Sequence, residues 1–167
     1  MKNPIWEVVG SRKNKTTDDI FKALKNVPIF SELNPRELNE IEKIIHRREY
    51  KKGEPIFRMG DPGLGMYIII NGSVSIVEED DAENATTLAV LKDGAFFGDL
   101  ALLDEAPRSA SAIADDHCDI LGFFRPDFLD LLYRKSKLGN KILFSLSKII
   151  GERLRRTNEQ MAVLKKK

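Results

Sequence analysis

The sequence contains few of the residues that disulfides and transition-metal sites require. Its 167 residues include one cysteine, Cys118, and two histidines, His46 and His117. A single cysteine cannot form a disulfide within the chain, which fits a reducing, cytosolic compartment. No zinc-ligand spacing, Walker motif or nucleophile elbow occurs, and the two histidines lie far apart in the sequence. We therefore expect no catalytic site and no metal site, and interpret the protein as a binding module rather than an enzyme.

The chain also lacks an excess of charge of one sign and any long hydrophobic run. Lysine and arginine total 27 against 26 aspartates and glutamates, for a formal net charge of +1. Such a balance provides no overall basic field for nucleic acid or an anionic membrane. The apolar runs are too short for a membrane span, and the N-terminus lacks the layout of a signal peptide. The sequence predicts a cytoplasmic protein that does not associate with a membrane.

The length predicts one compact domain. Residues 1–15 are mixed and polar, and are expected to form a loose N-terminal arm, so that residues 16–167 form the domain. Residues 16–46 have helical features: Thr17 or Asp18 can cap a first helix, and Asn34 followed by Pro35 is a clear start signal for a second. We expect N-terminal helices in this part of the chain.

Residues 47–125 consist of short segments bounded by turn residues. Val74 and Ile76, for example, alternate with serines. Short alternating segments at even spacing predict the strands of a β-barrel or sandwich. The predicted strands are Arg47–Lys51, Pro55–Arg58, Met66–Asn71, Ser73–Val77, Thr86–Leu91, Ser109–Ala114 and Asp119–Arg125. The acidic run at residues 78–83 lacks the glycine and spacing of a calcium loop, and is interpreted as a solvated hairpin tip.

Residues 126–167 have a helical pattern. Pro126 is expected to begin a short helix, and a longer helix to run from about Lys137 to Leu164. Residues that repeat every seven positions, together with residues at the alternate seam position of each heptad, form the seam of a short coiled coil. The seam residues are Leu143, Ile150, Leu154, Thr157, Met161 and Leu164. They predict a homodimer through this helix; the alternative, that this face packs on the β domain, stays open.

Residues 96–112 carry most of the functional information. They read Phe-Phe-Gly-Asp-Leu-Ala-Leu-Leu-Asp-Glu-Ala-Pro-Arg-Ser-Ala-Ser-Ala. A helix start offers unpaired N–H groups to an anion, and Gly98 has no side chain that would keep a ligand away from them. Arg108 can hold a phosphate, and Asp99 can accept a hydrogen bond from a sugar hydroxyl. Taken singly, these residues fit a turn, a cap and an exposed charge; together they predict a nucleotide site.

This segment resembles the phosphate-binding cassette of cyclic nucleotide-binding domains. The family pattern is roughly Phe-Gly-Glu-Leu-Ala-Leu-Leu, a short variable stretch, and Pro-Arg-Ser/Ala/Thr-Ala. The chain departs from it at Asp99, where the family usually has glutamate. A second family pattern, with Tyr-x-x-Gly-Glu-x-Ile-Phe-x-x-Gly-Asp at its start, matches Tyr50 to Ile70, and the resemblance covers about residues 20–164. It implies a mainly β fold with flanking helices: a β-roll (a double-stranded β-helix, or jelly roll) over residues 47–125, N-terminal helices before it and a long C-terminal helix after it.

The resemblance implies a cyclic nucleotide as ligand. Arg108 and the backbone N–H groups near Gly98 and Ser109 would hold the phosphate, and Asp99, although one methylene shorter than glutamate, would accept from the ribose 2′-OH. The set of ligand-binding residues is Phe97, Gly98, Asp99, Leu100, Ala101, Arg108, Ser109 and Ala110, with Thr157 and Asn158 at the base.

The nature of the base is predicted from the last helix. Residues 152–159 resemble the long helix of catabolite activator proteins, in which a Thr-Ser pair contacts adenine, and Thr157 and Asn158 occupy the matching positions. This favours cAMP over cGMP. A polar residue such as Thr157 can also set the register of a coiled coil, and that alternative stays open.

The resemblance implies a sensor or regulatory module without catalytic activity. No helix-turn-helix, kinase, channel or cyclase segment follows the long helix in this sequence. We therefore expect no DNA binding, and an output through helix rearrangement or a protein partner. The alternative is an interaction scaffold that has lost its ligand, with Asp99 as the sign of that loss; a transcription factor would require a longer natural chain.

Overall fold

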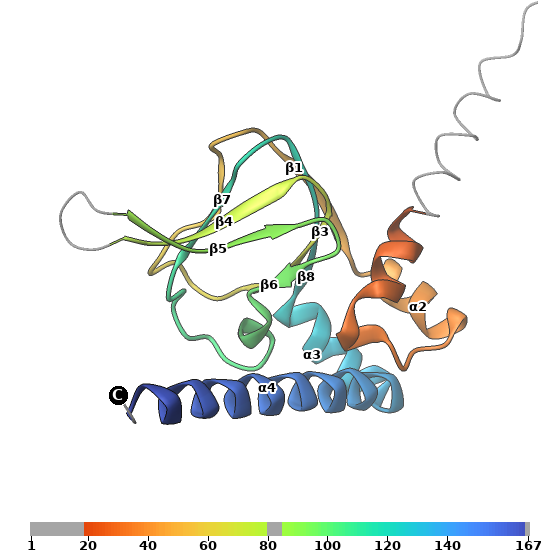
Figure 1. Ribbon diagram of the computed structural model, residues 1–167. Coiled ribbons are helices and arrows are strands. Elements are labelled where there is room, and N and C mark those ends of the chain that lie inside the picture. The colour runs from red at the N-terminus through yellow and green to blue at the C-terminus, as the bar shows by residue number, and fades with distance from the viewer. Residues whose placement is uncertain (1–18, 80–84, 166–167) are drawn as a thin grey trace, which may run out of the picture.

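The computed structural model describes residues 19–79 and 85–165 of the 167-residue chain. The predicted N-terminal arm at residues 1–15, the predicted caps Thr17 and Asp18, and most of the predicted acidic hairpin tip at residues 78–83 lie outside these ranges. Within them, the fold is a β-roll flanked by N-terminal helices and a long C-terminal helix (Figure 1), as the family resemblance predicted.

The described residues form two antiparallel four-stranded sheets. One has the strand order β1-β8-β3-β6 and the other β2-β7-β4-β5. The strands are β1 (His46–Tyr50), β2 (Pro55–Phe57), β3 (Gly65–Asn71), β4 (Ser73–Glu79), β5 (Ala85–Lys92), β6 (Phe96–Phe97), β7 (Ser111–Ala114) and β8 (Cys118–Phe124). All seven predicted strands are confirmed with shifted ends. The two-residue strand β6 was not predicted, because two residues are too few to show an alternating pattern.

The central strand β3 separates two hydrophobic cores. Met66 and Ile68 point to the core beneath the helices, whereas Tyr67 and Ile69 point to the core between the two sheets. Successive side chains of a strand lie on opposite faces, so a strand covered on both sides is apolar throughout. This explains why β3 lacks a polar face and holds both layers of the domain together.

The N-terminal helices and α3 lie at one end of the β-roll, and α4 runs beneath it (Figure 1). Residues 19–26 are helical. They are followed by the short 3-10 helix η1 (Pro28–Phe30), α2 (Pro35–Glu42), α3 (Arg125–Arg134) and α4 (Ser136–Leu164). The predicted start of α2 is confirmed: the Glu37 N–H donates to Asn34 Oδ1 at 3.0 Å, and the Asn34 N–H donates to Glu37 Oε2 at 2.9 Å, which forms a capping box. Within residues 19–79 and 85–165, no helix combines the length and apolar character that crossing a membrane requires.

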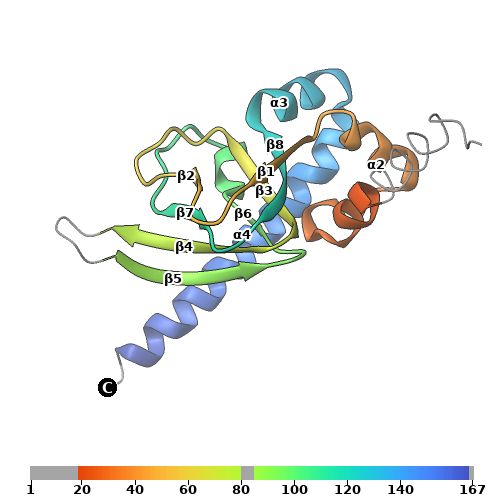
Figure 2. The same cartoon turned by 90° about the horizontal axis from the view of Figure 1, so that it is seen from above.

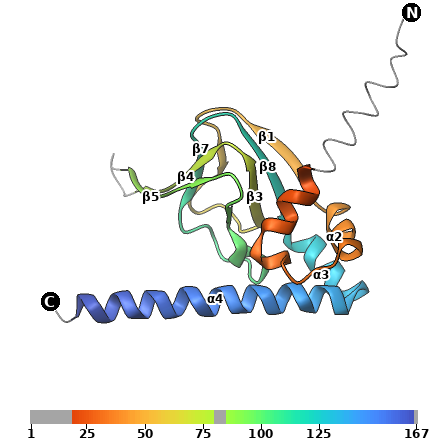
Figure 3. The ribbon, with the colours of Figure 1, turned by 45° about the vertical axis from the view of Figure 1, so that its right-hand side comes forward.

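The long helix α4 has two halves with different surroundings. Leu138, Ile142 and Leu146 are buried in the core beneath the β-roll, whereas every described residue from 152 onward is exposed. The helix crosses under the domain and continues past it (Figures 2 and 3). The predicted seam is therefore divided: Leu143 and Ile150 pack against the core, and Leu154, Met161 and Leu164 are 59%, 50% and 70% exposed.

Candidate functional site

A short turn after β6 begins the site. Gly98 has φ +72°, in the left-handed region, and the 3-10 helix η2 (Asp99–Leu102) follows at once. The predicted short helical turn after the glycine is confirmed. A Cβ on residue 98 would lie 2.7 Å from Nη1 of Arg108. Both the backbone conformation and the close approach of Arg108 therefore require glycine here.

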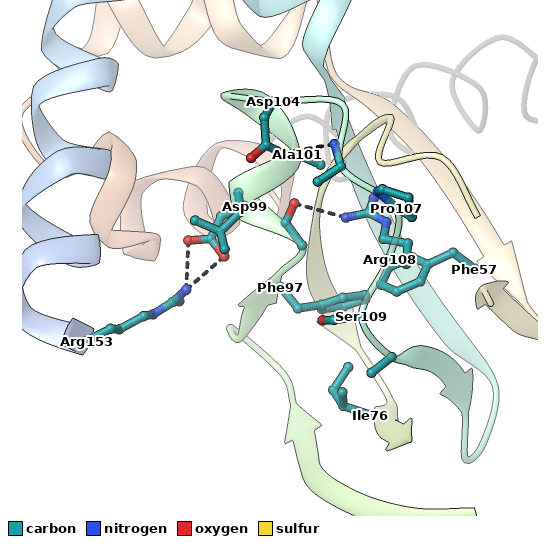
Figure 4. Close-up of a pocket in the computed structure, with 14 residues that line it drawn as sticks. Phe57, Ile76, Phe97, Asp99, Ala101, Asp104, Pro107, Arg108, Ser109 and Arg153 are labelled. Carbon is teal, nitrogen blue, oxygen red and sulfur yellow. Dashed lines mark hydrogen bonds and ion pairs between the residues drawn. The ribbon is translucent and has the colours of Figure 1, made fainter. Parts of the chain in front are cut away.

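A cavity of about 380 Å³ opens beside this turn (Figure 4). The predicted residues at positions 97–101 and 108–110 all line it, together with Ile76 of β4 and Arg153 of α4. The predicted base-contacting residues lie elsewhere. Thr157 and Asn158 are exposed and do not line the cavity, and the Thr157 hydroxyl donates to the Arg153 carbonyl in its own helix at 3.0 Å. Their contact with a base stays a prediction.

Arg108 lies buried at one side of the cavity and is 8% exposed. Its Nη2 donates to the Gly65 carbonyl at 2.6 Å and its Nη1 to the Gly98 carbonyl at 3.2 Å. Burial lowers the pKa of Arg108, because removal from water disfavours the charged form. Its buried Nε has no hydrogen-bond partner among the described residues. A desolvated guanidinium that lines a cavity is suited to receive an anion.

The carboxylate of Asp99 lies at another side of the cavity and is 3% exposed. Nη1 of Arg153 donates to both of its oxygens, at 2.9 Å each (Figure 4). A buried carboxylate needs such a partner because its lost hydration is otherwise uncompensated. The ion pair links the exposed half of α4 to the turn that follows Gly98.

Sequence reasoning missed Arg153 and Phe57. Arg153 stands in a charged run with Arg155 and Arg156, and its residue type does not distinguish it from them. Its position one helical turn before Thr157 was the available signal. Phe57 was expected only as a strand residue, yet its ring centre lies 4.1 Å from Cζ of Arg108. Arg108 lies in the loop before β7, which pairs with β2, and a contact between residues so far apart in sequence leaves no local pattern.

The cavity combines a buried cation, a buried carboxylate and apolar walls. A guanidinium fork binds phosphate, a carboxylate accepts hydrogen bonds from sugar hydroxyls, and apolar walls such as Phe97 and Ile76 can cover a flat base. The arrangement is suited to binding a phosphorylated nucleoside.

Comparisons with known proteins agree with this arrangement. The model of the cyclic nucleotide-binding domain family matches residues 47–135. The cyclic AMP receptor protein of Thermus thermophilus is 34% identical over 141 residues, which cover 84% of this chain and 63% of that protein. The crystal structure of the Thermus thermophilus catabolite activator protein superposes with a TM-score of 0.73 at 34% identity, covering 83% of this chain and 63% of that one.

A cyclic nucleotide-binding domain from Methylobacillus flagellatus KT gives a TM-score of 0.75 at 25% identity, covering 92% of this chain and 85% of that one. The family match extends over more than half of the sequence and includes the whole of the cavity-lining turn. The chain therefore belongs to the cyclic nucleotide-binding domain family. It spans 63% of the length of the Thermus receptor protein.

Proposed function

We propose that this protein is a regulatory module that binds cAMP, in preference to cGMP, in the cavity beside η2. The observation that carries the proposal is the buried Arg108, whose Nε has no partner among the described residues. A bound phosphate would supply the missing acceptor and countercharge. The family match and the 34% identity to a protein named as a cyclic AMP receptor support cAMP as the ligand.

Each part of the nucleotide has a proposed partner. Arg108 and the N–H groups near Gly98, Ser109 and Ala110 hold the phosphate. Asp99 accepts from the ribose 2′-OH; an ionised carboxylate has about four lone-pair positions, so the two hydrogen bonds from Arg153 leave room for a further donor. Thr157 and Asn158 are proposed to reach the adenine when the exposed half of α4 closes over the site.

Calorimetric titration with cAMP and cGMP tests the proposal. We expect one site per subunit and tighter binding of cAMP. Arg108→Ala should weaken binding by about a hundredfold or more, because a buried phosphate loses its charged partner. Arg108→Lys keeps a cation, so its affinity for cAMP should lie between those of the wild type and Arg108→Ala. Arg36→Ala, which removes an exposed arginine of α2, is the control and should bind cAMP like the wild type. A folded Arg108→Ala variant with unchanged affinity contradicts the site.

The role of Asp99 has its own test. If it accepts from the ribose, 2′-deoxy-cAMP should bind the wild type about tenfold more weakly, since a buried acceptor loses its donor. Asp99→Glu, which restores the residue usual in the family, should bind cAMP at least as well as the wild type. Equal affinities for cAMP and its 2′-deoxy analogue would mean that Asp99 serves Arg153 alone.

The output of the module is also proposed. Binding is passed on through movement of α4 or through a protein partner, and α4 pairs two subunits through its exposed apolar residues Leu154, Met161 and Leu164. A regulatory role without catalysis, a cytoplasmic location, and independence from DNA and membranes stay predictions. The competing function, a scaffold without a ligand, predicts no heat of binding for either nucleotide.

A further inference from the structure

Arg108 is a buried cation that has no ion-pair partner within the described ranges. Asp99, the buried carboxylate of the same cavity, pairs with Arg153 instead. Removing a guanidinium from water is costly, and an unpaired buried charge tends to turn toward solvent or toward an acidic neighbour. Tyr67 and, more weakly, Asp61 raise the pKa of Arg108 and so partly offset the effect of burial. Other contacts must therefore hold the guanidinium at the cavity when no ligand is present.

Two carbonyl groups and two aromatic rings lie against the guanidinium. The Gly65 and Gly98 carbonyls accept from its two terminal nitrogens at 2.6 and 3.2 Å. The ring of Phe57 covers one flat face, with 4.1 Å from Cζ to the ring centre, and the ring centre of Tyr67 lies farther away, at 5.8 Å from Cζ. A cation within about 6 Å of a ring centre is attracted by the negative face of the ring, and the attraction increases when water is excluded. The carbonyl groups thus fix the edge of the guanidinium, and the nearer ring, that of Phe57, fixes its plane.

The ring of Phe57 is itself held in place by two others. Phe57, Tyr67 and Phe97 form an aromatic cluster with ring centres 5.7 Å apart for Phe57 and Tyr67, 5.9 Å for Phe57 and Phe97, and 5.5 Å for Tyr67 and Phe97. Tyr67 and Phe97 are buried and belong to one sheet, whereas Phe57 belongs to the other. Figure 4 shows Phe57 and Phe97 beside the Arg108 side chain. Packing between the sheets therefore sets the position of the ring against Arg108.

We infer that Phe57 is a positioning residue whose ring keeps the Arg108 guanidinium charged, shielded from water and oriented toward the cavity before a ligand arrives. The inference rests on the proposed function, in that the anion received there is the phosphate of a cyclic nucleotide. A cation already in place needs no rearrangement on binding, so more of the interaction energy appears as affinity. Without the ring, Arg108 turns toward Asp61 in part of the molecules. The apparent affinity for the ligand is then reduced in proportion to the fraction of molecules that keep Arg108 at the cavity.

The first test uses the free protein and needs no ligand. The Nε–H of Arg108, assigned by its disappearance in Arg108→Lys, should give a nitrogen-15 NMR signal shifted by the ring current of Phe57 and slow in hydrogen exchange. In Phe57→Leu the signal should move to the position of exposed arginines and exchange faster. A signal at the exposed-arginine position in the wild type overturns the inference, whatever the protein binds.

The second test changes the electrostatics of the ring with little change in its shape. Phenylalanine with one, two and three ring fluorines is placed at position 57, and the Kd for cAMP is measured at each step. The affinity should fall stepwise, by about three- to tenfold at three fluorines, if the cation–π contact positions Arg108. The same series at Phe144, whose ring lies 4.6 Å from Nζ of Lys148 outside the cavity, is the matched control and should be flat.

The two hypotheses fail in different ways. A flat series at position 57 in a protein that binds cAMP overturns the positioning role and leaves the proposed function intact. A wild type that binds neither cAMP nor cGMP contradicts the proposed function, and the NMR measurement then decides the position of Arg108 by itself.

Discussion

Arg153 of α4 donates from a single guanidinium nitrogen to both carboxylate oxygens of Asp99, at 2.9 Å each. The two residues are 54 positions apart in sequence, and only one of them is buried. Asp99 belongs to the turn that lines the cavity, whereas Arg153 stands where α4 leaves the body of the domain. The ion pair therefore connects the predicted ribose contact to the part of the helix that is expected to pair subunits.

Replacing Arg153 should destabilise the fold. In Arg153→Ala the buried Asp99 loses its partner, and because Arg153 is about half exposed we expect a loss of about 1–2 kcal/mol rather than the 3–5 kcal/mol of a fully buried pair. Thermal unfolding should show a Tm lower by about 2–8 °C. Arg155→Ala, two residues along the same exposed stretch, is the control and should leave the Tm unchanged.

A double-mutant cycle with Asp99→Asn isolates the pair. Once Asp99 has no charge, removal of Arg153 should cost less than it does in the wild type. Fully additive losses would show that the two side chains do not stabilise each other.

A comparison of two glycines with the same backbone conformation distinguishes the effect of backbone strain from an effect on ligand binding. Gly98 and Gly94 have φ values of +72° and +80°, so alanine should cost each about 1 kcal/mol of stability. A Cβ at Gly98 also meets Arg108 Nη1 at 2.7 Å, whereas a Cβ at Gly94 has nothing within 4 Å. Gly98→Ala should therefore weaken cAMP binding by about tenfold or more, because it displaces the guanidinium that is proposed to hold the phosphate. Calorimetry on Gly94→Ala should give the wild-type affinity; equal losses in both variants would attribute the effect to backbone strain.

Two truncations divide the roles of the exposed half of α4. A chain ending at Arg156 keeps the Arg153–Asp99 pair and loses Thr157, Asn158 and most of the exposed seam, whereas a chain ending at Gly151 also loses the pair. Both should keep a folded β-roll, since every described residue after 151 is exposed. Light scattering should give a dimer for the full chain and monomers for both truncations.

The affinity for cAMP should fall in two steps along this series. The loss of affinity in the chain that ends at Arg156 measures the predicted base contact. The further loss in the chain that ends at Gly151 measures the contribution of Arg153. A full-length monomer contradicts the dimer, and an Arg156-terminated chain with unchanged affinity contradicts the base contact of Thr157 and Asn158.

Acid should loosen the attachment of α4 to the N-terminal helices. Glu32 and Glu37 accept from Lys148 and Lys141 at 2.7 Å, and hydrogen bonds from these lysines lower the pKa of both carboxyls. The side-chain hydrogen bonds that Lys135 and Lys43 donate to Glu40 lower its pKa from the usual 4.5 to about 2. A carboxyl whose pKa is lowered in the folded protein stabilises the fold fully at pH values above its usual pKa. It loses that contribution as the pH falls from the usual pKa to the lowered one.

For Glu40 the loss should run from about pH 4.5 to about pH 2. The Tm of Glu40→Gln should therefore depend less on pH in this window than that of the wild type. Glu78→Gln, at an exposed position of β4, is the control and should follow the wild-type curve. Identical slopes for the wild type and Glu40→Gln would show that this contact does not stabilise the fold.

Local patterns in the sequence determined the elements of this fold. The capping signals at Asn34 and Pro35, the alternation in β4 and the apolar run of β3 depend on the preferences of neighbouring residues, so they can be recognised without tertiary contacts. The same holds for the glycine, carboxylate and arginine of residues 96–112. Their spacing is a property of one short loop, and the structure brings all three to a single cavity.

Tertiary packing decided the side-chain contacts that the local sequence pattern does not predict. Arg153 differs from Arg155 only in the direction in which its side chain leaves α4, and that direction depends on how the helix lies against η2. The ring of Phe57 meets Arg108 because β2 pairs with β7, and Arg108 lies in the loop just before β7. The sequence by itself determined which side chains could hold a phosphate and a sugar; the tertiary structure decided which partners hold those side chains, because ion pairs and ring contacts depend on distances that the fold alone sets.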